Sequence, residues 1–239
     1  MIQTGTATVS EDCLRSGRFI DSGHPAVAAF AAEVAGDESN PVDAAVKLYY
    51  AVRDRILYDP YVPPDDPDTY RASAVAARGR GYCVGKASLL AAVARARGIP
   101  ARIAFADVRN HLATPRLLEL IGTDVFIYHG ITELWLAGRW IKATPTFNLT
   151  LCEKFRIHPL EFDGRADAVL HPFDRDGLRH MEYLRLRGSY ADVPIDILMP
   201  AMLQAYPRLA AFSKTLRGDF AREAKEQGTP SGDSASRSH

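Results

Sequence analysis

The chain has 239 residues, of which 47% are hydrophobic and 24% are charged, a composition typical of a globular protein. The 29 basic and 29 acidic side chains cancel, so net charge gives no reason to expect nucleic acid or an anionic membrane as a partner. This composition also excludes collagen-like, disordered and disulfide-rich proteins for the bulk of the chain.

Two absences indicate a cytoplasmic location. The first residues lack the basic and apolar segments of a secretion signal, and no apolar run reaches the roughly 18 residues that a membrane span requires. The cysteines, Cys13, Cys83 and Cys152, are odd in number and far apart. They therefore fit neither a disulfide framework nor a metal knuckle, and indicate a reducing compartment in which a thiol stays free.

The N-terminal third of the chain is predicted to be helical. Residues 24–35 and 41–56 have apolar side chains at helical spacing, and Asn40 and Pro41 are typical of a helix start. Residues 59–68 contain four prolines and are therefore predicted to form a loop. A short helix is expected at about 72–77.

A glycine-rich turn then leads into the next predicted helix. The turn spans residues 79–83, and the helix is expected over residues 84–97. Gly98 and Pro100 follow as stop signals.

The pattern changes after this helix to short runs rich in β-branched and aromatic residues, typical of a mostly antiparallel sheet. The predicted strands are residues 101–108, 123–128, 131–136 and 140–144. Helices followed by strands indicate an α+β fold.

The C-terminal part is predicted to contain loops and then two helices, at about 195–206 and 210–225. Residues 226–239 are rich in Gly, Pro and Ser and are predicted to be a disordered tail, because they bury too little apolar surface to offset the entropy of ordering. We therefore expect one domain over residues 1–225.

Cys83 stands at the predicted start of a helix. The free N–H groups and the positive end of the helix dipole favour a thiolate there, and a thiolate is the nucleophilic form of cysteine. By position alone, a small buried residue that packs the helix is the commoner role for a free cysteine.

His129 ends a predicted strand that would lie beside this helix. A cysteine nucleophile needs an imidazole, held on a rigid element, to take its proton and return it to the leaving group. The common alternative is a histidine that only satisfies a backbone carbonyl at a sheet edge.

Two segments resemble the transglutaminase-like superfamily. The run from Gly79-Arg-Gly-Tyr-Cys83 through an apolar helix to Gly98-Ile-Pro-Ala-Arg102 is similar to the family's nucleophile segment. His129, Trp140 and Pro145-Thr146 resemble its second segment, in which an aromatic-rich hairpin leads into aspartate-proline-threonine. The resemblance covers about residues 41–148.

This resemblance implies a papain-like core, with the nucleophile helix packed on a mostly antiparallel sheet between N-terminal and C-terminal helices. It also implies chemistry on amide bonds through Cys83 and His129, as in transamidation, peptide hydrolysis or deglycosylation.

One position departs from the family pattern, because Thr144 stands where the orienting aspartate belongs. A threonine hydroxyl can accept a hydrogen bond from the imidazole but cannot stabilise imidazolium as a carboxylate does. If residues 137 and 138 form a two-residue turn, the numbers of any two residues that face each other across the hairpin add up to 275. His129 and Thr144 then lie on the same face of the hairpin. A three-residue loop would separate them. Asn148, Asp163 and Asp107 remain alternatives.

These observations predict a cysteine-dependent acyl-transfer enzyme that forms an acyl-enzyme on Cys83 with His129 as proton shuttle and Thr144 as the third member. Its expected substrate is a peptide or protein amide, without a metal or organic cofactor and without nucleic acid or membrane partners. The alternative is a binding module that keeps the fold without turnover, as the missing aspartate suggests. The oligomeric state stays open.

Overall fold

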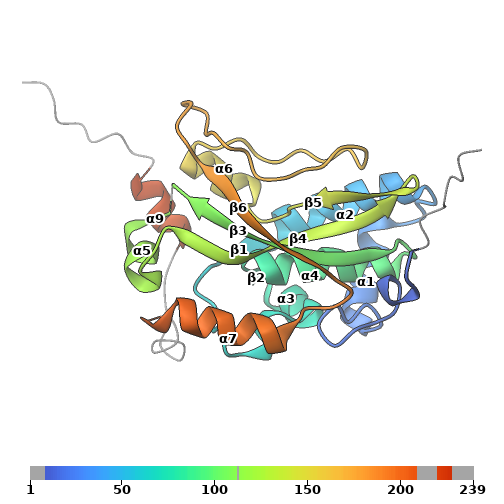
Figure 1. The fold of residues 1–239 in the computed structure, drawn as a ribbon. Coiled ribbons are helices and arrows are strands. Elements are labelled where there is room, and N and C mark those ends of the chain that lie inside the picture. The colour runs from blue at the N-terminus through green and yellow to red at the C-terminus, as the bar shows by residue number, and fades with distance from the viewer. Residues whose placement is uncertain (1–8, 112, 209–219, 228–239) are drawn as a thin grey trace, which may run out of the picture.

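The computed structural model describes residues 9–111, 113–208 and 220–227, and it has an α+β fold built around a four-stranded antiparallel sheet in the order β5-β4-β3-β6 (Figure 1). The strands are β3 (Ala101–Asn110), β4 (Val125–Leu136), β5 (Arg139–Ala143) and β6 (Met181–Tyr190). The α+β class predicted from the sequence is confirmed.

The β4–β5 hairpin has the register expected for a two-residue turn. Trp135 pairs with Trp140 and Glu133 pairs with Lys142, and the turn residues have φ angles of 48° at Ala137 and 82° at Gly138. Positive φ at both positions matches the right-handed twist of the strands.

Four helices precede the sheet in the chain: α1 (Pro25–Ala35), α2 (Pro41–Arg55), α3 (Ala72–Arg78) and α4 (Cys83–Ala96). Asn40 caps α2 as the sequence predicts, since its Oδ1 accepts the amide of Val42 at 2.9 Å. Gly98 has a φ of 73°, in the left-handed region that favours glycine after a helix end.

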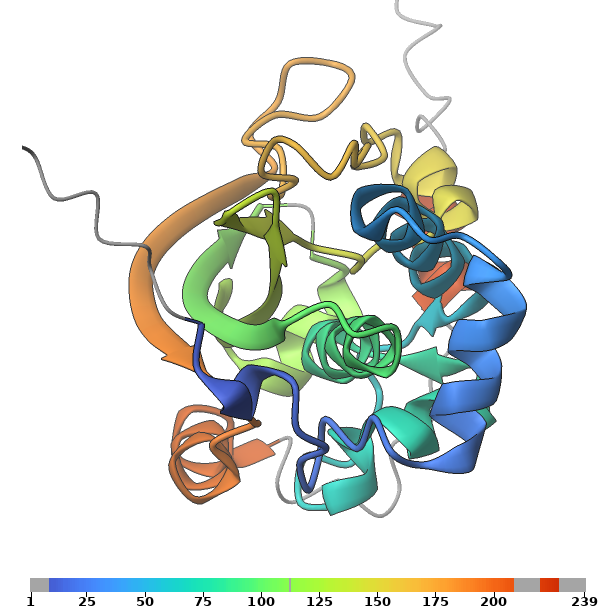
Figure 2. The ribbon, with the colours of Figure 1, turned by 90° about the vertical axis from the view of Figure 1, so that its right-hand side faces the viewer.

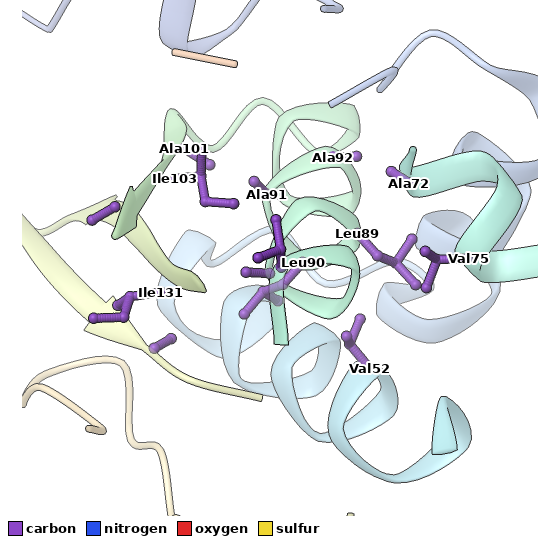
Figure 3. Packing of buried hydrophobic residues seen from close by; sticks show 14 of the residues in the cluster. Val52, Ala72, Val75, Leu89, Leu90, Ala91, Ala92, Ala101, Ile103 and Ile131 are labelled. Carbon is purple, nitrogen blue, oxygen red and sulfur yellow. The ribbon is translucent and has the colours of Figure 1, made fainter. Parts of the chain in front are cut away.

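Helix α4 lies at the centre of the molecule, between the curved sheet and the N-terminal helices (Figure 2). Every residue from Val84 to Arg95 is buried. Leu90 and Ala91 lie toward Ile103 of β3, whereas Leu89 lies toward Val75 of α3 (Figure 3). A helix that is apolar on all sides is typical of one that is enclosed on all sides.

Lys86 and Arg95 are the buried residues of α4 with basic side chains, and Lys86 has no exposed surface. Its Nζ donates to the carbonyl oxygens of Arg53 at 2.9 Å and Ile56 at 2.6 Å, at the C-terminal end of α2. Burial lowers the pKa of Lys86 to about 7. These bonds tie α4 to α2.

The remaining described elements surround this centre. They are the 3-10 turns Glu11–Cys13 and Pro67–Thr69, the parallel pair β1 (Leu57–Tyr58) and β2 (Arg80–Gly81), and the helices α5 (Pro115–Ile121), α6 (Leu149–Phe155), α7 (Ile195–Ala205) and α9 (Phe220–Gln227). Within the described ranges, no helix combines the length and the apolar character needed to cross a bilayer.

The structure corrects several boundaries. The two strands predicted at 123–128 and 131–136 form the single strand β4, and Cys83 is the first residue of its helix rather than the residue before it. Strand β6 was not predicted, because it is an edge strand whose Leu186 is 72% exposed, so its apolar residues do not mark a buried face.

At the C-terminus, α9 includes residues 226 and 227, which the sequence assigns to the tail. Residues 228–239 of that tail and residues 210–219 of the last predicted helix lie outside the described residues.

Candidate active site

Cys83 is the first residue of α4 and follows the N-cap residue Tyr82. The first hydrogen bond of the helix runs from the Lys86 amide to the Tyr82 carbonyl oxygen at 3.0 Å. The amides of residues 83–85 therefore have no acceptor within the helix, as at any helix N-terminus. Cys83 as a whole residue is half-buried, while Cys13 and Cys152 are buried.

Gly130 brings strand β4 against the first turn of α4. A Cβ atom at this position would lie 2.8 Å from the Cα of Val84 and 3.3 Å from the carbonyl oxygen of Cys83. Only a residue without a side chain allows this approach. His129, the preceding residue, is thereby held beside the helix end, and it lines the same pocket as Cys83.

The local bend of β4 also contributes to this placement. His129 pairs with Ala106 of β3, the register shifts between Ala106 and Val108, and Tyr128 has a φ of 54°. A bulge of this kind redirects the side chains of a strand.

The thiol is not activated in the way the sequence predicts. Burial raises the pKa of Cys83 to about 11, although the amides of Gly130, Val84 and Cys83 lie close enough to the sulfur to favour the thiolate. The expected lowering by the helix terminus is therefore wrong for this structure, because loss of hydration outweighs the amide dipoles.

Burial also lowers the pKa of His129, to about 4. Its Nε2 is buried and makes no hydrogen bond within the described part of the chain. Burial thus favours the uncharged form of both side chains.

Thr144 directly follows β5 and has 1% of its surface exposed. Its amide donates to the carbonyl oxygen of Ala168 at 3.0 Å, which fixes its backbone. The buried Oγ1 of Thr144 makes no hydrogen bond of good geometry to any described residue. It lies close to the phenol of Tyr183, and this proximity acts to lower the pKa of that phenol. The confirmed register pairs Ala143 with Thr132, and continuing it by one residue would put Thr144 opposite Ile131, on the face of His129 that the sequence predicts.

Tyr183 is a neighbour of this site that the sequence did not indicate. Its ring lies 6.4 Å from the His129 ring, centroid to centroid, and its oxygen accepts the amide of Leu170 at 3.2 Å. Burial raises its pKa to about 12. It lies on β6, so its proximity depends on the unpredicted pairing of β6 with β3.

The other candidates to orient His129 are bonded elsewhere. Asn148 Oδ1 accepts the amide of Tyr58 at 3.0 Å, and Asp163 caps an exposed turn by accepting the amides of residues 165 and 166. Asp107 Oδ1 accepts from the amide of Tyr128 and from the Nε of Arg187. None of these three side chains bonds to Nε2 of His129 in the part of the chain that the structure describes.

Comparison with protein families shows which family this part of the chain matches. Residues 28–145 match the model of the transglutaminase-like superfamily, a range that includes Cys83, His129 and Thr144. The chain belongs to the transglutaminase-like superfamily. The family match agrees with the resemblance found in the sequence.

A solved structure similar to this transglutaminase-like protein is that of a "putative cysteine protease" from Cytophaga hutchinsonii. The two share 16% sequence identity with a TM-score of 0.43, over 74% of this chain and 53% of that one. The chain thus spans about half the length of that protein. A comparison with curated proteins finds no match.

The part of this transglutaminase-like protein that the structure describes contains no cluster of metal ligands. No group of three or more His, Cys, Asp or Glu side chains there could hold a metal ion. The chemistry that the site offers is that of its thiol, its imidazole and its hydroxyl groups.

Proposed function

We propose that this protein is a cysteine-dependent acyl-transfer enzyme that acts on amide bonds. The observation that carries the proposal is the close packing of β4 on the α4 N-terminus through Gly130, which places Cys83 and His129 on one pocket. A nucleophile and a base on two rigid elements that share a pocket are the arrangement that covalent catalysis requires.

The reaction starts when the Cys83 sulfur attacks the carbonyl carbon of the amide, while the thiol proton passes to His129. The imidazolium then gives this proton to the leaving nitrogen, the C–N bond breaks, and the acyl group remains on Cys83 as a thioester. Water, activated by His129, attacks the thioester and restores the thiol with release of a carboxylic acid. Water is the proposed acceptor.

The raised pKa of Cys83 and the lowered pKa of His129 disfavour a stable thiolate–imidazolium pair in the free enzyme, so in this proposal the proton moves during the attack on the carbonyl carbon. The amides at the start of α4 are free of helical acceptors and can bind the developing oxyanion.

Thr144 and Tyr183 are the proposed positioning residues for His129. Their hydroxyl groups lie near one another, and the Tyr183 ring lies 6.4 Å from the imidazole, centroid to centroid. Two neutral hydroxyls can fix the orientation of the ring, but they supply less stabilisation of imidazolium than the family's aspartate does.

The test is to trap the acyl-enzyme with p-nitrophenyl acetate and to measure the intact mass. We expect one acetyl group on Cys83, none in Cys83→Ala, and a strongly reduced rate in His129→Ala. Cys13→Ala is the control and should acetylate normally. Equal acetylation of Cys83→Ala would contradict the proposal.

A non-catalytic binding module is the second candidate, favoured by Thr144 in place of the aspartate and by the uncharged state of both side chains. The two functions differ in what Cys83→Ala does in the cell. A Cys83→Ala gene that fully complements a deletion strain would support the binding module, and loss of complementation with a folded protein would support the enzyme.

A further inference from the structure

The pocket that contains Cys83 and His129 has walls from many elements and a cavity volume of about 70 Å³. A cavity of this volume has room for a small organic group rather than for a whole drug-sized ligand. Its walls include Val62, Leu117, Ile121, Phe126, Ile127 and Met202.

Apart from the cysteine and the histidine, the described lining residues carry no ionisable acid or base other than tyrosine phenols. Asp107, a buried carboxylate on β3, accepts from Arg187 and is not part of the wall. A charged ligand group would therefore lose its hydration in this pocket without gaining a partner.

Several polar groups of the wall are bonded within the protein. Thr69 Oγ1 donates to the carbonyl oxygen of Pro63 at 2.6 Å. Tyr206 Oη donates to the Val125 carbonyl oxygen at 3.0 Å and accepts the Ile127 amide at 2.6 Å. Both residues therefore present mainly carbon to the pocket.

Two buried polar atoms of the described wall make no hydrogen bond, Thr146 Oγ1 and His129 Nε2, and Tyr82 Oη lies close to the phenol of Tyr70. Thr146 has 1% of its surface exposed. A substrate with one polar group, its carbonyl, and an apolar remainder matches such a wall, because a buried donor without a partner is costly and a ligand acceptor relieves that cost.

We infer that the substrate carries an uncharged apolar group on the acyl side of the bond attacked by Cys83, and that this group occupies the pocket. The inference rests on the proposed function and adds the substrate class to it. The acyl side is assigned because the acyl group stays attached to Cys83 through both half-reactions, whereas the leaving amine and the incoming water exchange with solvent.

The first test uses the p-nitrophenyl esters of acetate, butyrate and hexanoate, with the mono-ester of glutarate as a charged ester of similar length. We expect kcat/KM to rise by about tenfold or more from acetate to hexanoate, since each buried methylene adds favourable transfer free energy. The glutarate ester should react more slowly than hexanoate. Equal rates for all esters, or preference for glutarate, would overturn the inference while leaving acylation of Cys83 intact.

The second test measures binding without turnover, so that it stays informative if acylation fails. Calorimetry with Cys83→Ala should show that N-methylhexanamide binds and that N-methylacetamide binds at least about tenfold more weakly, for the same physical reason. Equal binding of both amides, or binding of neither, would overturn the assignment of the pocket independently of the proposed chemistry.

A charge placed in the wall provides the matched variant. Ile127→Glu should reduce the preference for hexanoate over acetate, whereas Leu186→Glu, on the exposed side of β6 and outside the pocket, should leave it unchanged. If Ile127→Glu fails to fold, the ester series on the unaltered protein still decides. An unchanged preference in folded Ile127→Glu would contradict the inference.

Discussion

At the scale of single residues, the site is governed by burial. The thiol of Cys83 lies at a helix start, where amide groups favour its ionisation, and yet its pKa is raised to about 11. The dipole of a helix end is a modest effect, worth about 0.3–1 kcal/mol at exposed positions, and removal of a thiolate from water costs more. The position of Cys83 in the sequence therefore predicted the wrong direction for the shift of its pKa.

The reactivity of Cys83 provides a direct prediction. Alkylation of the native protein by N-ethylmaleimide should reach Cys83 before Cys13 and Cys152, because it alone is not fully buried. Its rate should keep rising with pH beyond 9, toward the pKa of about 11. Peptide mapping after timed quenching measures both. A rate that levels off near pH 6 would show a thiolate and contradict this picture.

The neighbourhood of His129 allows a second prediction. Thr144→Asp should place a carboxylate beside the imidazole and raise the pKa of His129 from about 4, because an opposite charge stabilises imidazolium. Thr144→Val, of similar shape, should leave that pKa low and reduce turnover. Imidazole NMR titration separates a positioning role from a merely structural one. An unchanged titration in folded Thr144→Asp would remove Thr144 from the site.

At the scale of secondary structure, the contact of β4 with α4 positions the candidate site. Gly130→Ala should push the strand away from the first turn of α4, since the added Cβ would lie 2.8 Å from the Val84 backbone. We expect loss of Cys83 acetylation with retained secondary structure by circular dichroism.

Gly23→Ala is the control for the Gly130 variant. The added Cβ there meets only the flexible Ser16 side chain, at 3.3 Å, so acetylation should persist. Acetylation of Gly130→Ala at the normal rate would show that the close approach of strand and helix is dispensable.

Elements with strong local signals could be predicted from the sequence. Asn40 and Pro41 marked the start of α2, and the register of the β4–β5 hairpin followed from its turn, which put Thr144 on the face of His129. The proximity of Tyr183 could not be predicted, because it depends on a long-range pairing of an edge strand with an exposed face. The pKa directions also depend on tertiary burial.

At the scale of the whole molecule, two histidines buried in the uncharged state make stability depend on pH. Burial lowers the pKa of both His129 and His180 from 6.5 to about 4. Between these values the unfolded chain binds more protons than the folded one, so stability is full above pH 6.5 and falls as the pH drops toward 4.

Guanidinium unfolding at pH 7, 5.5 and 4.5 measures this effect. We expect the midpoint to fall steadily, and His180→Phe, whose ring keeps the contact with Phe147, to lose less stability over the same range. The control His24→Asn alters an exposed helix cap instead and should keep the full dependence. A midpoint independent of pH would contradict burial of neutral imidazoles.

The enclosed position of α4 has a consequence for how the protein unfolds. The N-terminal helices cover one side of α4 and the later sheet covers the other, and Lys86 ties it to the end of α2. None of the elements packed on α4, namely helices α1 to α3 and strands β3 and β4, can leave without exposing it, so these elements should form a single cooperative unit. Native-state hydrogen exchange should then show α4 amides exchanging only with the global free energy of unfolding, and a fragment of residues 1–100 should remain largely unprotected until the complementary fragment is added.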